Sequence, residues 1–507
     1  MKKQIAAVVL AIVIGFPLSG CDRGNSRQSA GENSPAAAQS VELKVESTEL
    51  ATVPEGWDKD TLSFSDQGDS YAFVVRTAGG DLVVRDGKQG RMFSKCGSVI
   101  FAPKTADLFY WAAERDGSHA RIDLVNNDTV IPTEYVAEGW LLFSRDGKRW
   151  LTVGGTQSGP GEGGQVVIMC DGKEFSRHSD ASIPQFSADG EHVSYLVKDS
   201  GGVALHVDGK EVRTYKEPEL KCSSAFNAFL IGPNMNNSFF TKYLSDGRLL
   251  VLSYSPKGWT VYRDNDPLAV YLHNVWGGGG LQTITYKDFN NTQSIVPWSV
   301  TVAENAPVSL WWEREAGQQE QWRIVRDGKP VDTVICNWFW GSQRPVISDN
   351  GLHWGYVART VTPPSTNEEI HAVVDGRLFG PYGNVWGLSF STAGKRFAYA
   401  ASELSGEKDK DTWSFFVDGT PVPLKYRSVW PPVFSSDGNH VAWKATRENK
   451  AVVALDGKEI AVEAALLWGP SFDGNQKLVW AVADDNKLIR RSVVFPKHRS
   501  SWLSWWK

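Results

Sequence analysis

Apolar and polar residues alternate in short runs along most of the chain, and the clearest run lies between residues 430 and 460. Val441, Trp443 and Ala445 are each separated by one residue and follow the pair Asp437-Gly438. A period of two beside an Asp-Gly pair predicts a β-hairpin with a type I′ turn, which needs two residues at positive φ. A second hairpin is predicted around Asp456-Gly457. The two hairpins predict a four-stranded unit that cannot bury both faces alone and therefore stacks on copies of itself.

This unit recurs about ten times between residues 55 and 495. Its first turn, usually preceded by Phe-Ser, recurs at Asp146-Gly147, Asp189-Gly190, Asp246-Gly247 and Asn350-Gly351, and in degenerate form at Gln67-Gly68 and Ala393-Gly394. Its second turn recurs at Asp86-Gly87, Asp171-Gly172, Asp208-Gly209, Asp327-Gly328, Asp375-Gly376 and Asp418-Gly419. Two weaker copies lie near residues 100–131 and 296–333. Together with 48 Gly and 22 Trp among 507 residues, this pattern predicts an all-β array.

The repeated pattern Phe-Ser-x-Asp-Gly followed by an apolar position is clearest at 186–195 and 434–443. It resembles the WD40-like repeats of the TolB-type β-propellers, and the resemblance covers roughly residues 55 to 495. It implies a propeller of four-stranded blades. Ten units exceed the usual four to eight blades. We therefore expect about 8–10 repeat units in which some units share a blade, or one unusually large ring, or two tandem rings with the irregular stretch from Tyr271 to Trp298 as the break.

The two ends of the chain differ from the repeats. Lys2 and Lys3, an apolar run and then Leu18-Ser19-Gly20-Cys21 resemble a bacterial lipoprotein signal, which implies a signal peptide over residues 1–20 and an acyl lipid such as palmitate on Cys21. Asp22 resembles the inner-membrane retention signal of enteric-type lipoproteins. Residues 21–40 are small and polar and read as a flexible tether. The expected location is the cell envelope, on the periplasmic side.

Residues 41–496 are assigned to the propeller repeats and residues 497–507 to a basic, aromatic tail. Val41, Leu43 and Val45 alternate with charged residues but have no hairpin partner nearby. We expect this lone first strand to complete the last blade and close the ring. The tail after Pro496 combines Lys, Arg and Trp, which suits a membrane interface or an acidic partner as well as a loosely packed end.

Several tryptophans occupy equivalent places in successive units. Trp386, Trp430 and Trp468 each stand four residues before a Phe, and Trp140 and Trp340 occupy looser versions of the same place. Equivalent positions lie around a circle in a propeller, so these indoles could line one face or the channel mouth and bind a sugar, a peptide or a partner loop. The alternative is packing between blades.

The residues that could carry chemistry give no catalytic or metal site. His192, His353 and His440 share one position, but Arg149 and other residues fill it elsewhere, so an exposed polar strand position explains them better than a metal site. The G-x-G-x-x-G match between residues 159 and 164 lacks a strand-to-helix unit, and G-x-S-x-G is absent. No cofactor is implied.

Cysteine usage and charge set two further limits. After Cys21 the chain holds Cys96, Cys170, Cys222 and Cys336, which allow three disulfide pairings or free buried thiols. The net charge of −5 and pI near 6.0 give no basic field for nucleic acid. The sequence therefore favours a lipid-anchored propeller that binds or scaffolds an envelope protein. The alternative is a periplasmic enzyme, or a ligand or glycan sensor, with its site at the channel mouth.

Overall fold

The computed structural model of the chain describes residues 43–116, 119–156, 164–199, 202–215, 241–255, 258–264, 266–272, 297–303, 305–314, 322–332, 345–361, 368–403, 412–484 and 486–495. Residues 43–507 form one compact unit, and residues 1–42 lie outside the described ranges. Every regular element in the described ranges is a β-strand. Within them, no helix has the length and apolar character needed to cross a membrane.

The strands form ten antiparallel sheets, numbered here as blades 1 to 10 in chain order. Blades 1 to 3 contain β2 (Trp57–Phe64), β3 (Tyr71–Thr77), β4 (Gly80–Arg85) and β5 (Lys88–Phe93); β6 (Lys95–Phe101), β7 (Leu108–Asp116), β8 (His119–Asn126) and β9 (Thr129–Ile131); β10 (Trp140–Phe143), β11 (Trp150–Gly155), β12 (Val166–Cys170) and β13 (Lys173–His178). Blades 4 to 6 contain β14 (Gln185–Phe186), β15 (Val193–Asp199), β16 (Gly202–Val207) and β17 (Lys210–Tyr215); β18 (Thr241–Tyr243), β19 (Leu249–Ser255), β20 (Gly258–Arg263) and β21 (Asp266–Leu272); β22 (Pro297–Val302), β23 (Ser309–Arg314), β24 (Trp322–Arg326) and β25 (Lys329–Asp332).

Blades 7 and 8 contain β26 (Val346–Ile347), β27 (Trp354–Val361), β28 (Glu368–Val374) and β29 (Arg377–Tyr382); β30 (Asn384–Phe390), β31 (Phe397–Ser402), β32 (Trp413–Val417) and β33 (Thr420–Pro421). Blade 9 has a divided innermost strand, because β34 (Ser428–Val429) and β35 (Val433–Phe434) both pair with β36 (Val441–Arg447), and it continues with β37 (Lys450–Leu455) and β38 (Lys458–Glu463). Blade 10 contains β39 (Trp468–Asp473), β40 (Lys477–Asp484), β41 (Lys487–Val494) and β1 (Val45–Thr52).

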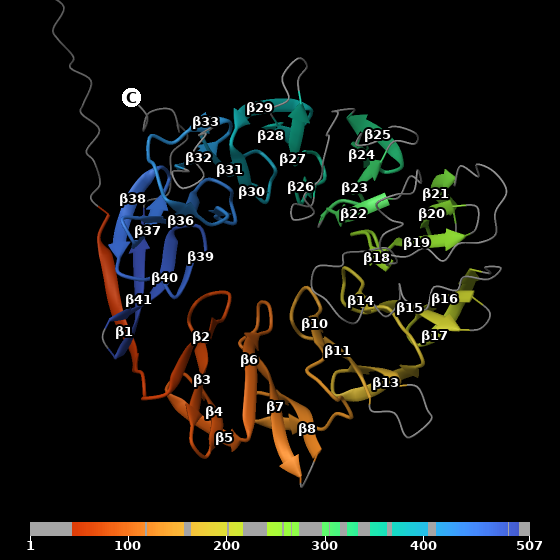
Figure 1. The fold of residues 1–507 in the computed structure, drawn as a ribbon, viewed down its shortest axis with the longest axis horizontal. Coiled ribbons are helices and arrows are strands. Elements are labelled where there is room, and N and C mark those ends of the chain that lie inside the picture. The colour runs from red at the N-terminus through yellow and green to blue at the C-terminus, as the bar shows by residue number, and fades with distance from the viewer. Residues whose placement is uncertain are drawn as a thin grey trace, which may run out of the picture. The chain divides into compact units, whose positions relative to one another are not determined.

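The blades of residues 43–507 follow one another around a single axis as a β-propeller (Figure 1). In each blade the first strand lies innermost, and the innermost strands of blades 1 and 10, β2 and β39, contact each other. The all-β propeller prediction is confirmed, and the ring contains ten blades. The two weaker repeats are blades 2 and 6, and the alternative of two tandem rings is wrong.

The ring closes through the two ends of the propeller. β1 pairs antiparallel with β41 from Val45 opposite Val493 to Thr52 opposite Lys487. An ion pair between Lys487 Nζ and Glu49 Oε2, 2.8 Å apart, joins the same two strands. The prediction that the first strand completes the last blade is confirmed, although the strand begins at Val45 rather than at Val41, which lies outside the described residues.

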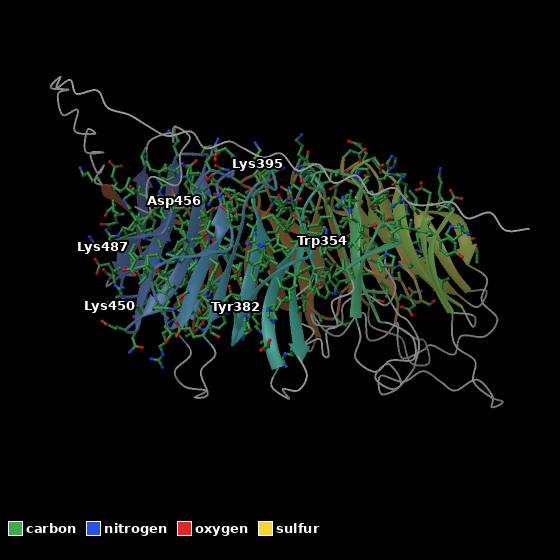
Figure 2. All side chains as sticks on the ribbon, turned by 90° about the horizontal axis from the view of Figure 1, so that it is seen from above. Trp354, Tyr382, Lys395, Lys450, Asp456 and Lys487 are labelled. Carbon is green, nitrogen blue, oxygen red and sulfur yellow. The ribbon has the colours of Figure 1, made fainter. Side chains whose placement is uncertain are left out.

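The two edges of the ring differ, and we name them by their connections. The turn edge links the first strand to the second in each blade and the third to the fourth in blades 1 to 9, and these connections are short. The loop edge links the second strand to the third and each blade to the next. Its connections vary widely: β5 ends at Phe93 and β6 begins at Lys95, whereas β17 ends at Tyr215 and β18 begins at Thr241. In the side view of Figure 2, Lys395 lies toward the turn edge and Lys450 and Tyr382 toward the loop edge.

The two predicted turns have different geometry. In the second turn both residues have positive φ, as at Asp456 (49°) and Gly457 (80°), which confirms a type I′ hairpin. In the first turn only the glycine does, as at Gly438 (71°), so the type I′ prediction at Asp437-Gly438 is wrong. The chain instead forms a longer turn around Ser435, whose Oγ donates to Asp437 Oδ1 at 2.7 Å and accepts from the His440 backbone N–H at 3.0 Å.

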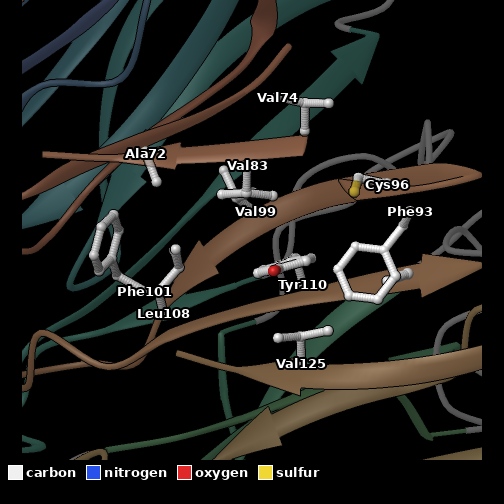
Figure 3. Close-up of a cluster of buried hydrophobic side chains, with 11 residues drawn as sticks. Ala72, Val74, Val83, Phe93, Cys96, Val99, Phe101, Leu108, Tyr110 and Val125 are labelled. Carbon is white, nitrogen blue, oxygen red and sulfur yellow. The ribbon is translucent and has the colours of Figure 1, made fainter. Parts of the chain in front are cut away.

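The hydrophobic core is divided among the spaces between blades. Figure 3 shows one such cluster, in which Val74 and Val83 of blade 1 face Val99 and Tyr110 of blade 2. Elsewhere the fully buried ring of Phe415 in blade 8 stacks on Trp443 of blade 9, with centroids 4.6 Å apart. Each blade therefore buries its two faces against its neighbours, as expected for repeats that are not stable singly.

Candidate partner-binding site

The predicted tryptophans occupy different environments. Trp468 of blade 10 stacks on Phe64 of blade 1, with ring centroids 4.6 Å apart and planes inclined by 29°. Trp140 is half-buried and packs against the core between blades 3 and 4. Both therefore pack between blades. Trp340 lies outside the described residues.

Trp386 and Trp430 are exposed, each with 40% of its surface accessible to solvent. Trp386 is the third residue of β30, opposite Ala400, and Trp430 follows β34 and donates its backbone N–H to Lys444 O at 3.1 Å. Both belong to the half of the innermost strand nearer the loop edge. Two large indoles are thus exposed on adjacent blades at one edge of the ring.

Close packing brings the backbones beside these indoles together. Gly387 follows Trp386, and a Cβ built on it would lie 2.8 Å from Cα of Pro431, which follows Trp430. Gly387 also has φ of +70°, which suits glycine. The register between β30 and β31 shifts between Trp386 and Ser389, so a bulge sets the position of the indole.

Lys444 lies beside Trp430 on the neighbouring strand β36. Its Nζ is 4.5 Å from the centroid of the Trp430 ring and donates to the Leu466 carbonyl oxygen at 3.3 Å. The side chain is half-buried, and this burial lowers the pKa of its ammonium group. Among the described residues, no carboxylate forms an ion pair with Lys444. The geometry is that of a cation–π contact at an indole face that is also partly open to solvent.

A second cation, which has no acidic partner in the described part of the chain, lies in the same blade. Arg427 is exposed, its backbone N–H donates to Thr446 O at 2.8 Å, and its Nη1 donates to Asn449 Oδ1 at 3.2 Å. The neighbouring Arg447 is different, because its two Nη atoms each donate at 2.8 Å to the carboxylate of Glu459. We name Trp386, Arg427, Trp430 and Lys444 the blade 8–9 rim. The sequence pattern indicated the two tryptophans but not the two cations, because whether a cation has an acidic partner depends on the folded structure.

The three shared histidines bind aspartates of the second turn. Nδ1 of His192, His353 and His440 lies 2.7, 2.7 and 2.6 Å from an Oδ2 of Asp208, Asp375 and Asp456. Arg149 and Arg396 make the same contact with Asp171 and Asp418, at 3.0 and 2.9 Å. The position is therefore a structural contact at the turn edge. The expectation of an exposed position is wrong for His440, which is buried.

The described cysteines are free thiols. Cys96 and Cys170 are buried in blades 2 and 3 and form no disulfide. Burial raises the pKa of Cys96 to about 12 and that of Cys170 to about 11. Cys222 and Cys336 lie outside the described residues. The free-thiol alternative therefore holds for Cys96 and Cys170.

No protein-family model matches the chain. No curated protein matches it either. Among solved structures it is similar to the tricorn protease (10% identity, TM-score 0.27, covering 83% of this chain and 46% of that one). It is also similar to the acylaminoacyl peptidase of Pyrococcus horikoshii (11% identity, TM-score 0.29, covering 70% of this chain and 60% of that one). A third similar structure is TolB from Acinetobacter baumannii (10% identity, TM-score 0.21, covering 78% of this chain and 79% of that one). The chain thus spans less than two thirds of the tricorn protease and of the peptidase.

Proposed function

We propose that this protein is a lipid-anchored β-propeller of the cell envelope that binds or scaffolds a protein partner. The observation that carries the proposal is the exposure of Trp386 and Trp430 on adjacent blades. Single exposed apolar residues are ordinary, but neighbouring large aromatic side chains at one edge are typical of interaction sites. Tryptophan is also among the residues that contribute most to binding at protein interfaces.

The arrangement of connections supports the same proposal. The loop edge carries all the long connections, and binding functions are commonly placed on loops that a rigid scaffold presents. The lipobox ending at Cys21 supports an anchor, and Asp22 supports the inner membrane. β1 begins at the turn edge, where Val45 lies opposite Val493. The proposal places the partner at the loop edge.

Site-specific photo-crosslinking in intact cells tests the proposal. We expect a p-benzoylphenylalanine residue at position 430 to yield a discrete protein adduct, because it replaces an exposed indole of the proposed interface. The same residue at position 395, on the turn edge, is the matched control and should yield no such adduct. Adducts of equal yield at both positions, or none at position 430, would contradict the proposed interface.

Membrane fractionation tests the anchor separately. Replacing Cys21→Ser removes the thiol that would carry the lipid, so the protein should move from the membrane fraction to the soluble one. Replacing Cys96→Ser provides a cysteine control that should leave fractionation unchanged. Unchanged fractionation of the Cys21 variant would exclude the lipid anchor while leaving the partner-binding proposal open to the crosslinking test.

One observation also supports a second function. Exposed indoles stack on sugar rings as well as on protein side chains, so the rim tryptophans suit a glycan sensor. This alternative predicts saturable binding of an envelope glycan that is lost in Trp430→Ala, with no protein adduct from position 430. The two cations beside the indoles favour an acidic protein partner over a neutral glycan.

A further inference from the structure

The blade 8–9 rim combines two chemically different surfaces. Trp386 and Trp430 present apolar area, whereas Lys444 and Arg427 present positive charge. The contact of Gly387 with Pro431 holds the two blades against each other between the indoles. The rim is therefore built on strands of a closed ring, and we expect its groups to keep their places when a partner binds.

The charge of Lys444 is incompletely compensated. Its ammonium group is half-buried, and its described contacts are a carbonyl oxygen and the face of an indole. Neither carries a full negative charge. Partial burial removes water from the ammonium, which strengthens the attraction of a carboxylate that reaches it. Arg427 adds a guanidinium whose described side-chain partner is the neutral amide of Asn449.

Several other cations of blades 8 and 9 form ion pairs with carboxylates. Lys425 pairs with Glu403, and Arg447 pairs in bidentate fashion with Glu459 at 2.8 Å. Among the described residues, no carboxylate pairs with Arg427 or Lys444. The same holds for Lys395 and Lys450 of these blades, so the rim is distinguished by the indole beside Lys444 rather than by unpaired charge alone. The positive charge of the rim favours an acidic partner segment.

We propose that the blade 8–9 rim binds an acidic peptide segment of a protein partner, in which carboxylates reach Lys444 and Arg427 and apolar side chains contact Trp386 and Trp430. The inference rests on the proposed protein-binding function and adds the chemistry of the partner.

Binding of defined peptides to the purified full-length protein in detergent tests this proposal. The probe is an equimolar set of dye-labelled dodecapeptides that carry Glu, Leu, Phe and Trp in random order, and the comparison set carries Gln in place of Glu. We expect the Glu set to bind at least about tenfold more tightly, because each charge-assisted contact at a partly desolvated site contributes on that scale. Equal binding of the two sets would overturn the proposal.

Three variants and one control locate the binding. Lys444→Met keeps the aliphatic stem beside Trp430 but removes the charge, and Arg427→Gln removes the second cation. Each should weaken binding of the Glu set about tenfold, and Trp430→Ala should weaken binding of both sets. Lys395→Gln, the same charge change at the turn edge, should leave affinity within about twofold. Thermal unfolding of each variant verifies that it is folded. Unchanged affinity in the two charge variants would overturn the proposal.

Further outcomes separate this inference from the proposed function. The Glu peptides could fail to bind while the protein binds phosphatidylglycerol vesicles, or associates with itself, through Lys444. If either of these interactions is lost in Lys444→Met and the Glu peptides do not bind, the acidic-peptide proposal is overturned. A protein adduct from position 430 that persists in Lys444→Met would leave the proposed function standing and remove only the inferred chemistry. Loss of that adduct in Lys444→Met, together with Glu-peptide binding, would support both.

Discussion

His440 Nδ1 lies 2.6 Å from Asp456 Oδ2, and this contact joins the start of the second strand of blade 9 to the turn between its third and fourth strands. The other oxygen, Oδ1, accepts from the backbone N–H of Val441 at 2.9 Å. One carboxylate thus binds two groups at the beginning of β36. Because arginines make the equivalent contact in blades 3 and 8, the position requires a donor rather than a metal ligand.

Replacing His440→Ala should lower the free energy of unfolding by roughly 2–4 kcal/mol, because it leaves a largely buried carboxylate without its side-chain donor. Replacing His192→Arg should change it by less than about 0.5 kcal/mol, because that exposed position accepts arginine in other blades. Urea titration of both variants measures the contrast. An equal decrease in the free energy of unfolding in the two variants would show that arginine cannot replace the imidazole at this position.

Stability should depend on pH through His192. The hydrogen bond to Asp208 and the charge of that carboxylate raise the pKa of His192 above its ordinary value. Because the pKa is raised in the folded state, the contact contributes fully to folding stability below the unfolded-state pKa of about 6.5. This contribution is lost as pH rises through the folded-state pKa. The melting-temperature difference between wild type and His192→Gln should therefore be larger at pH 5.5 than at pH 8.5. A difference that grows with pH would contradict this assignment.

Closure of the ring should depend on β1 and not on the residues before it. Deleting residues 45–52 removes Val45 and Leu50, which pack against blade 10, and exposes the edge of β41. We expect a loss of roughly 3–6 kcal/mol, from at most about 1.5–3 kcal/mol for each of these two apolar side chains, and aggregation through the open edge. Deleting residues 41–44 instead should shift the melting temperature by only a few degrees. Similar effects of the two deletions would place closure elsewhere.

Replacing a rim tryptophan should lower the free energy of unfolding less than replacing Trp468, which packs between blades. Trp468→Ala removes a ring stacked on Phe64 between blades 10 and 1, so it should cost roughly 3–5 kcal/mol of folding stability. Trp386→Ala removes an exposed indole and should cost less than about 1 kcal/mol. Equilibrium unfolding of the two variants compares them directly. A large loss for Trp386→Ala would make that residue structural and remove it from the candidate site.

The buried thiols should be unreactive in the native protein. Burial and the charge of Asp81 raise the pKa of Cys96 to about 12, so the reactive thiolate is scarce at neutral pH. We expect iodoacetamide to label neither Cys96 nor Cys170 at pH 7.5 in the native state, and both after unfolding in guanidinium. Mass spectrometry of the digested protein identifies the labelled positions. Rapid native labelling of Cys96 would contradict its burial.

Much of the propeller could be predicted because its determinants are local in sequence. The period-two alternation around Val441 and Trp443 and the positive-φ requirement met by Asp456-Gly457 specify strands and turns within one blade. Their recurrence determined the number of units, and the unpartnered strand near Val45 indicated how the ring closes. The turn predicted at Asp437-Gly438 was wrong, because the Ser435 hydroxyl stabilises a longer turn than the dipeptide alone implies.

The candidate site was decided by the tertiary structure. Trp386, Trp430 and Trp468 occupy similar places in the sequence, yet Trp468 packs on Phe64 across the ring closure while the other two remain exposed. Likewise, nothing in the sequence around Lys444 shows that its ammonium lies over an indole and that no described carboxylate pairs with it. The physical reason is that local patterns determine the backbone of each blade. Exposure and charge compensation depend instead on which side chains the neighbouring blade supplies.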